Sequence, residues 1–174
     1  MKMYNGSPEL FDRFDLSRVG DGTGIKFGFG VYQTESERSA RMKVSVVSFS
    51  YPRGVPDDPD DDYWGGFGFD CRSLPDPHGI AALKGMSGLD KPVVEFFEQH
   101  KAQIDSFLEA TEALVRQLID AFLMDGRDYL QVAFGCYGGH HRSVYMAERF
   151  AERLVGTLGI EVEVKHTACA FWNA

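Results

Sequence analysis

A glycine-rich loop with two histidines and an arginine is the segment of this chain best suited to chemistry. The apolar run 129–136 stops at residues 137–143, which read Tyr-Gly-Gly-His-His-Arg-Ser, and apolar residues with helical spacing begin at Val144. A strand that feeds a glycine-rich loop and then a helix is typical of anion sites, because the first N–H groups of a helix have no acceptor within it. The two glycines allow a sharp turn, and Arg142 and the histidines add side-chain donors. We therefore expect this loop to bind a phosphate or a carboxylate.

The same loop supports more than one function. Cys136 and Arg142 satisfy C-x5-R-S, the pattern of cysteine-dependent phosphatases, in which a thiolate attacks phosphorus and the arginine holds the oxygens. Such an enzyme also needs a general acid, for which Asp70 and Asp76 are candidates. In a second interpretation the loop catalyses no reaction and only binds a phosphate, with Ser143 capping the helix. A tight strand-to-helix connection with a solvated arginine and no ligand is the third interpretation.

The histidines and acidic residues do not indicate a metal site. Adjacent His140 and His141 point in different directions on a regular element, and no further ligands stand at zinc-like spacing. The acidic run 57–62 lacks the spacing of a calcium loop, so we expect it to be an exposed loop. His78 would reach the rim of the glycine loop if the strand before it lies close in the sheet. We therefore expect no metal and no cofactor.

Hydrophobic periodicity places the loop in an α/β domain. We predict strands at residues 44–49, 67–72, 129–136 and 161–166, one long helix or a broken pair from Asp90 to about Met124, and a helix at residues 144–158. The last strand alternates and is expected at a sheet edge. This order predicts a mainly parallel sheet of about four strands flanked by helices, in a single domain. Ligands bind such sheets at the carboxyl ends of the strands, where the glycine loop falls.

The composition is typical of one cytoplasmic globular domain. Of 174 residues, 44% are hydrophobic and 25% are charged. No apolar stretch of about 18 residues occurs, so we expect neither secretion nor a membrane span. Three cysteines without a C-x-x-C pair predict reduced thiols. The net charge of -8 opposes nonspecific binding of nucleic acids, which relies on Lys and Arg.

Three blocks of the sequence resemble the C-terminal domain of the RNase adapter protein RapZ family. They are residues 69–78 (FDCRSLPDPH), 85–93 (GMSGLDKPV) and 134–148 (FGCYGGHHRSVYMAE). The resemblance implies an α/β domain likened to a phosphofructokinase subdomain, with a pocket that senses glucosamine-6-phosphate. In the full-length family, an N-terminal P-loop ATPase domain precedes this part, which binds small regulatory RNAs and self-associates.

The resemblance also implies a set of pocket residues. Carried over by position, the set comprises His78, Cys136, Tyr137, Gly138, Gly139, His141, Arg142 and Ser143. His140 stands where the family often has Lys or Gln, so the charge of the pocket differs. Arg53 is the candidate substitute for a family lysine after the first strand, although arginine and lysine are not equivalent at a tight phosphate site.

Two departures from the family pattern limit what can be carried over. The sequence has no G-x-x-x-x-G-K-[ST], so ATPase activity is not expected. The family's basic RNA-binding tail is absent, since residues 167–174 read TACAFWNA, and this makes RNA an unfavoured partner.

The first 42 residues form a Gly-rich polar extension that precedes a RapZ C-terminal-like domain at residues 43–174. Tyr4-Asn5-Gly6-Ser7 and residues 28–32 resemble the opening motifs of ADP-ribosyltransferase-like domains, but Asn5 replaces the expected histidine. We interpret the extension as a remnant without transferase activity.

The leading hypothesis is a binding or sensor module for a phosphorylated small molecule, with an amino-sugar phosphate as the favoured ligand. A cysteine-dependent phosphatase acting through Cys136 and Arg142 is the alternative, and an RNA-binding adapter is the third hypothesis. Homo-oligomerisation remains open.

Overall fold

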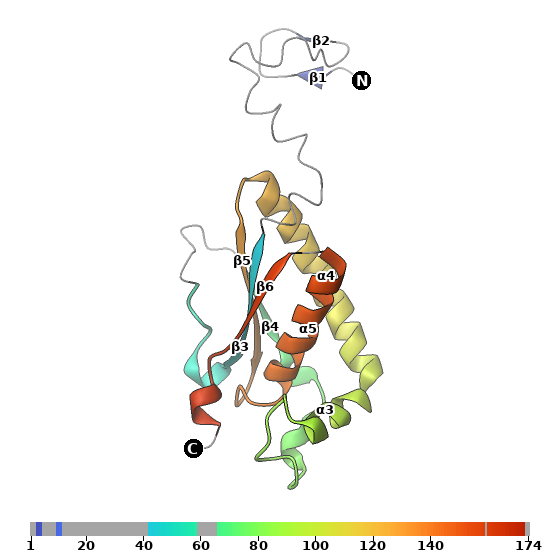
Figure 1. The fold of residues 1–174 in the computed structure, drawn as a ribbon, viewed down its shortest axis with the longest axis vertical. Coiled ribbons are helices and arrows are strands. Elements are labelled where there is room, and N and C mark those ends of the chain that lie inside the picture. The colour runs from blue at the N-terminus through green and yellow to red at the C-terminus, as the bar shows by residue number, and fades with distance from the viewer. Residues whose placement is uncertain (1–2, 5–9, 12–41, 59–65, 159, 173–174) are drawn as a thin grey trace. The chain divides into compact units, whose positions relative to one another are not determined.

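The computed structural model describes residues 3–4, 10–11, 42–58, 66–158 and 160–172 (Figure 1). The chain divides into two compact units, Met1–Arg38 and Ser39–Ala174. In the first unit, β1 (Met3–Tyr4) pairs antiparallel with β2 (Leu10–Phe11). Most of the motifs noted in the extension, including Asn5 and residues 28–32, lie outside the described residues, as does most of the acidic run, residues 59–62.

The second unit contains a four-stranded parallel sheet in the order β4-β5-β3-β6. Its strands are β3 (Lys43–Ser50), β4 (Gly66–Asp70), β5 (Tyr129–Cys136) and β6 (Glu161–His166). The two central strands, β3 and β5, pair along their whole length and are buried on both faces. Burial on both faces agrees with the largely apolar sequence of β5, whereas β3 mixes apolar residues with three buried serines, Ser45, Ser48 and Ser50. The predicted α/β fold with a parallel sheet is confirmed, and the alternating strand β6 lies at an edge as expected.

β4 is shorter than the strand predicted at residues 67–72. It ends at Asp70, and Cys71–Ser73 form a 3-10 turn. The Asp70 carboxylate accepts the backbone N–H of Arg72 at 2.9 Å and pairs with the Arg72 guanidinium at 2.6 Å. A local side-chain acceptor therefore competes with the ladder and ends the strand.

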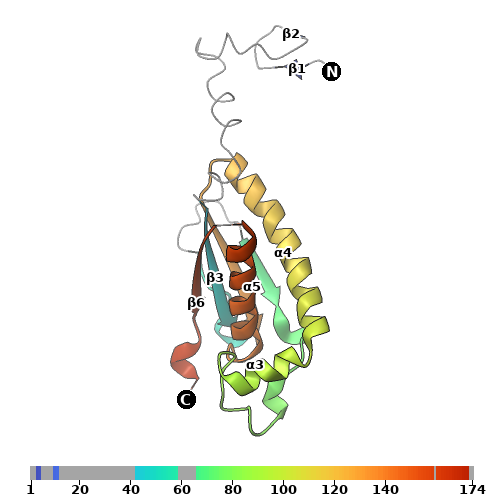
Figure 2. The same ribbon diagram turned by 45° about the vertical axis from the view of Figure 1, so that its right-hand side comes forward.

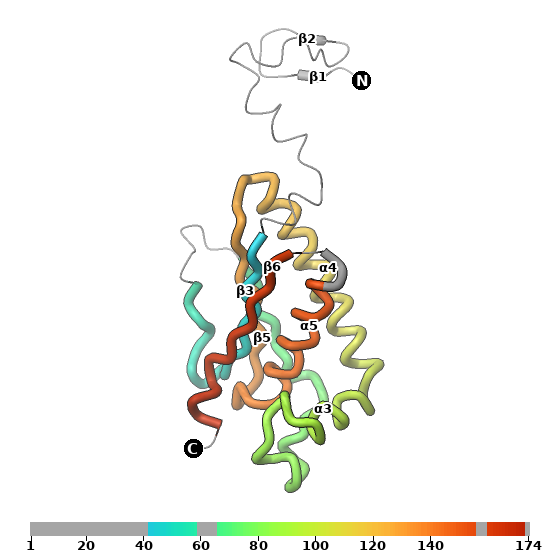
Figure 3. Tube along the Cα trace, viewed as in Figure 1, coloured from blue at the N-terminus to red at the C-terminus, as the bar shows by residue number. Residues whose placement is uncertain are grey.

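Three helices follow the strands: α3 (Lys91–Glu98), α4 (Lys101–Met124) and α5 (Arg142–Leu158). The region from Asp90 to Met124 is thus a broken pair, and the break is marked by His100, whose Nδ1 lies 2.8 Å from the carbonyl oxygen of Phe96. Asp90 is the N-cap residue of α3, but its carboxylate accepts bonds from the N–H and hydroxyl of Ser87 instead of capping. The Cα trace in Figure 3 shows that α4 runs alongside the sheet and that the chain then turns back into β5.

α4 and α5 pack on one face of the sheet, and α3 lies next to α4 near the carboxyl ends of the strands (Figure 2). Their core partners on that face include Val44, Val46, Val132 and Phe134, which are completely buried. At about 25 cal/mol per Å² of apolar surface removed from water, this burial is the main favourable term in folding. None of the described helices is long and apolar enough to cross a membrane.

The opposite face of the sheet is covered by the segment that follows β3. Tyr51 packs there against Val47, Phe49 and Ala133, and the Gln131 side-chain amide donates to the carbonyl oxygen of Pro56 at 3.3 Å. The chain thus leaves β3 toward one face, whereas α5 leaves β5 toward the other. Neighbouring strands whose connections part in this way leave a crevice at their carboxyl ends, which is the preferred ligand position in parallel sheets.

Candidate functional site

The glycine loop lies in the crevice between β3 and β5. Gly139 has a φ of +64°, in the left-handed region, and a side chain there would bring its Cβ to 2.7 Å from the Cβ of Ala168 and 3.0 Å from the backbone of Ser50. Only glycine fits both the conformation and the space. The Ser50 hydroxyl also donates to the carbonyl oxygen of Tyr137 at 2.8 Å. The loop is therefore fixed against β3 on one side and the C-terminal segment on the other.

The first turn of α5 supplies backbone donors at the end of this loop. α5 begins at Arg142, two residues earlier than predicted, and the N–H of Tyr145 donates to the carbonyl oxygen of His141 at 2.9 Å. Within the described part of the chain, the N–H groups of residues 138–143 find no acceptor. Such donors, together with the positive end of the helix dipole, favour an anion.

A cavity of about 390 Å³ lies beside this loop and includes Gly138, His140, His141 and Arg142 in its lining. Its lining brings together seven of the residues that the sequence predicts for the site, together with four others. The predicted ones are His78, Cys136, Tyr137, Gly138, His140, His141 and Arg142, and the others are Asp76, Lys84, Phe171 and Trp172.

Three predicted site residues do not line the cavity. Gly139 faces Ser50 and Ala168. Ser143 is fully buried and its hydroxyl lies 3.1 Å from the Cys136 sulfur, so it contacts the strand end instead of capping α5. Arg53 stacks its guanidinium over the Phe171 ring at 3.4 Å from the centroid, so it reaches the site only through that ring.

The Arg142 side chain connects two segments of the cavity wall. Its guanidinium pairs with the Asp76 carboxylate at 2.9 Å and donates to the carbonyl oxygen of Arg72 at 3.0 Å. A third, longer contact reaches the carbonyl oxygen of Leu74 at 3.5 Å. The guanidinium thus ties residues 70–79 to the start of α5, and it is not turned to solvent, because only 11% of its side chain is exposed.

His141 is a neutral imidazole at neutral pH. Its Nε2 lies 3.1 Å from the carbonyl oxygen of Leu83, which can only accept, so Nε2 carries the hydrogen. Burial lowers the pKa of His141, outweighing the carbonyl contact that raises it. In the neutral form Nδ1 is therefore an acceptor, which suits a hydroxyl or ammonium group of a ligand.

His140 is held by the C-terminal segment. Its ring stacks on Trp172 with centroids 5.2 Å apart, and the Trp172 indole donates to the carbonyl oxygen of Gly139 at 3.1 Å. Burial, and then the neighbouring His141, lower the pKa of His140. His78 comes from the other wall, with its ring centroid 6.1 Å from that of His141. The predicted approach of His78 to the glycine loop thus agrees with the geometry.

Sequence reasoning missed three side chains of this cavity. Lys84 lies in a turn between two of the recognised blocks, and nothing in its spacing singles it out. Phe171 and Trp172 stand out as adjacent aromatics in a tail of otherwise small and polar residues, and this was the only signal that could have indicated them.

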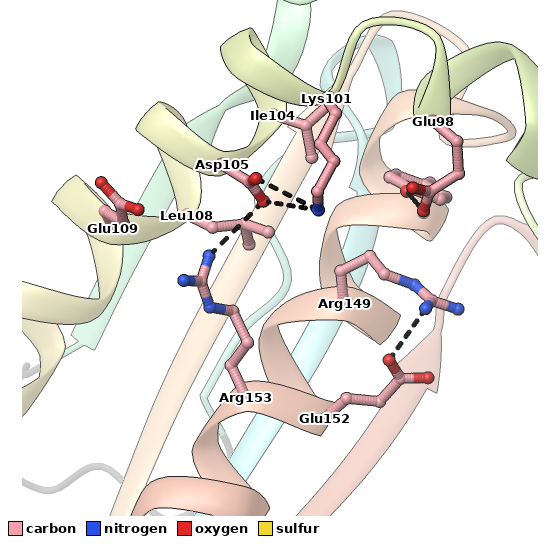
Figure 4. A pocket seen from close by; sticks show the side chains of 10 residues that line it. Glu98, Lys101, Ile104, Asp105, Leu108, Glu109, Arg149, Glu152 and Arg153 are labelled. Atoms are coloured by element: carbon pink, nitrogen blue, oxygen red, sulfur yellow. Dashed lines mark hydrogen bonds and ion pairs between the residues drawn. The ribbon is translucent and has the colours of Figure 1, made fainter.

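A second cavity of about 350 Å³ lies between α4 and α5 (Figure 4). Its charged groups face one another: Lys101 pairs with Asp105 at 3.1 Å, and Arg149 pairs with Glu152 at 3.0 Å. An incoming ion would have to displace these partners, whereas the glycine loop offers backbone donors. No group of three or more potential metal ligands occurs among the residues that the structure describes.

The fold and the loop define an α/β domain with a glycine-rich strand–loop–helix connection at the carboxyl edge of its parallel sheet. The family model of the RapZ C-terminal domain matches residues 42–170, and the chain belongs to this family.

Relatives include a nucleotide-binding protein of Histophilus somni, 36% identical over 125 residues, and one of Thermobifida fusca, 37% identical over 132 residues. The RNase adapter protein RapZ of Yersinia pseudotuberculosis is 38% identical over 116 residues. These matches cover 72%, 74% and 67% of this chain but only 41%, 41% and 38% of the relatives.

Replacing Gly139 with alanine should destabilise the fold. The left-handed backbone and the contact with Ala168 predict a loss of about 1–3 kcal/mol in the free energy of unfolding. Gly138→Ala is the matched control, because no positive φ and no close contact is found there, and it should change stability by less than about 0.5 kcal/mol. Urea unfolding of both variants measures the difference, and equal stabilities would contradict the described loop.

The lowered pKa of His141 predicts a pH dependence of stability. The folded state disfavours the protonated ring, whereas the unfolded chain protonates near its ordinary pKa of 6.5. Stability is therefore full above that value and falls as the pH drops below it. His141→Gln, whose amide nitrogen can take the place of Nε2 and donate to the carbonyl oxygen of Leu83, should lose less thermal stability on acidification than the parent. Parallel loss in both proteins would be inconsistent with a neutral His141.

Proposed function

We propose that this domain binds a phosphorylated small molecule in the cavity of the glycine loop, with an amino-sugar phosphate such as glucosamine-6-phosphate as the favoured ligand. The observation that carries the proposal is the convergence of the α5 first-turn donors, Lys84 and three histidines on one cavity of about 390 Å³. A volume of this size falls in the range of roughly 300–1,000 Å³ that is typical of small-molecule sites.

The phosphate would lie at the N-terminus of α5. Backbone N–H groups of the loop can each donate to one of its oxygens, and Lys84, which also lines the cavity, adds a positive charge. Hydrogen bonds that involve charged groups are roughly twice as strong as neutral ones. Because these donors are held by the fold, binding needs little ordering of the protein.

The remainder of the ligand would contact aromatic side chains at the mouth of the cavity. Tyr137 is 69% exposed and Phe171 is 47% exposed, although both line the cavity. Aromatic rings offer apolar faces of this kind to ring-shaped ligands, such as the C–H face of a sugar. This arrangement supports a sugar phosphate over inorganic phosphate alone.

The names of the relatives describe longer proteins. "Nucleotide-binding protein" and "RNase adapter protein" belong to chains of which this one spans about two fifths. A nucleoside monophosphate is accordingly a competitor ligand to test. RNA ranks last, because the net charge of -8 opposes a phosphate backbone.

Lys84→Met should weaken the binding of glucosamine-6-phosphate by roughly tenfold or more, the loss of one hydrogen bond to a charged group. Isothermal titration measures the change. Lys91→Met is the matched control, because Lys91 is exposed on α3 and absent from the cavity lining. Absence of binding by any sugar phosphate to the folded parent protein would contradict the proposed function.

A cysteine-dependent phosphatase is the alternative function. One observation favours it: Cys136 and Asp76, the nominated nucleophile and acid, line the same cavity. Two oppose it, because Cys136 is only 3% exposed and Arg142 is bound to Asp76. Hydrolysis of a chromogenic phosphate ester that Cys136→Ser abolishes would establish the alternative.

A further inference from the structure

Two of the three free cysteines lie side by side at the carboxyl ends of neighbouring strands. Cys136 is the last residue of β5, and Cys71 directly follows β4. The register of these parallel strands pairs Asp70 with Gly135, and the backbone of Asp70 is extended, with φ -87° and ψ 108°. The chain therefore carries the Cα atom of Cys71 one step further along the same ladder, to a position opposite Cys136.

Both cysteine side chains lie on the face of the sheet that the helices cover. Side chains in a strand alternate between the two faces, so Cys71 shares its face with Phe69, and Cys136 shares its face with Phe134. The two phenylalanines are register partners, and their ring centroids are 5.5 Å apart. The cysteines are the next pair on this face and belong to the same buried cluster. A disulfide needs a Cα separation of about 4.4–6.8 Å, and paired strands are about 4.7–4.9 Å apart.

The two thiols differ in their access to solvent. Cys136 lines the cavity of the glycine loop, and because only 3% of it is exposed, this access suits an oxidant hardly larger than water. Cys71 is completely buried and absent from that lining. Burial raises the pKa of Cys71, and the charge of a Cys136 thiolate raises it further, so Cys71 stays protonated. A small oxidant that enters the cavity therefore meets Cys136 first.

We propose that Cys71 is the resolving cysteine for Cys136, and that the two form a reversible disulfide when hydrogen peroxide enters the cavity. In the first step the Cys136 thiolate attacks one peroxide oxygen and the O–O bond breaks. Cys136 becomes a sulfenic acid, and the leaving hydroxide takes up the thiol proton as water. In the second step the Cys71 sulfur attacks the Cys136 sulfur, the S–O bond breaks, and hydroxide leaves as water with the Cys71 proton.

This sequence is balanced in atoms and electrons. Two thiols and one peroxide give one disulfide and two water molecules. The two sulfurs lose two electrons, and the peroxide gains them. A thiol reductant reverses the disulfide by exchange, which regenerates both cysteines.

The strand register explains why the second step can compete with further oxidation. A sulfenic acid that meets no thiol is oxidised to sulfinic acid, which ordinary reductants do not reverse. The raised pKa of Cys71 slows its attack, but reaction partners held in position reach effective concentrations of roughly 10⁵ M or more. Cys71 therefore protects Cys136 from permanent oxidation. It also preserves the contact of the Cys136 sulfur with the Ser143 hydroxyl, 3.1 Å away at the start of α5.

Cys169 provides a control within the same chain. It is exposed, it lies in a 3-10 turn, and it is absent from the cavity lining. Cys169→Ser therefore removes the accessible thiol without touching the pair. Cys71→Val is the informative variant, because valine is a branched apolar side chain of similar size that cannot react with a sulfenic acid.

The test is treatment of the folded, reduced chain with hydrogen peroxide, followed by alkylation of the remaining thiols in urea and peptide mass spectrometry. We expect the parent protein and Cys169→Ser to lose two hydrogens at Cys71 and Cys136 and to yield one linked pair of peptides. Dithiothreitol should restore both thiols. Cys71→Val should instead gain two oxygens at Cys136, which dithiothreitol does not remove. A chain unfolded before treatment should lose the preference for this pair, because the register no longer holds the two sulfurs together.

Three outcomes would overturn the inference. One is recovery of Cys71 and Cys136 as free thiols after Cys169 has reacted completely. Another is a linked peptide that joins Cys169 to either cysteine in place of the pair. The third is sulfinic acid at Cys136 in the parent protein to the same extent as in Cys71→Val. Thermal unfolding before treatment confirms that the variant is folded, and Cys71→Ala provides the same comparison if valine disturbs the core.

Discussion

The site depends on backbone donors in the first turn of α5 that the helix itself cannot satisfy. β5 delivers the chain to this point, and the neighbouring strand β3 sends its own connection to the opposite face of the sheet. The crevice between them therefore stays open at the carboxyl edge. Gly139 completes the arrangement, since only glycine lets the loop pass so close to Ser50 and Ala168. The conformation of the loop and the topology of the sheet therefore both contribute to the group of backbone donors at the start of α5.

The electrostatics of the cavity come from fixed dipoles and a few placed charges. The chain as a whole is acidic, and burial lowers the pKa of both His140 and His141, so their rings add little positive charge at neutral pH. Lys84 is the cation of the cavity that is not paired with Asp76.

Much of the fold could be predicted because each strand carries its own pattern. The valine-rich run at residues 44–49 and the apolar run at residues 129–136 form the buried pair β3 and β5, and the alternating run forms the edge strand β6. The glycine loop could also be predicted, because its strand, its glycines and its helix are adjacent in the sequence. The end of β4 could not be predicted. The Asp70 carboxylate accepts the backbone N–H of Arg72 and so competes with the β-ladder, and composition does not reveal this contact.

The rest of the cavity is assembled by tertiary contacts between distant segments. Lys84, Phe171 and Trp172 line the cavity from segments that are distant from the loop in the sequence, and no local pattern predicts their meeting. The roles of two predicted residues also changed with context. Ser143 contacts the Cys136 sulfur, and Arg142 holds Asp76, because both are packed against a neighbouring strand or turn that the sequence alone cannot position.

The most direct measurement of the central claim is an NMR titration of the ¹⁵N-labelled chain with glucosamine-6-phosphate. The account predicts that the backbone amides of residues 138–143 shift most, because their N–H groups would donate to the phosphate. Shifts confined to the cavity between α4 and α5, or no shifts at saturating ligand, would contradict it.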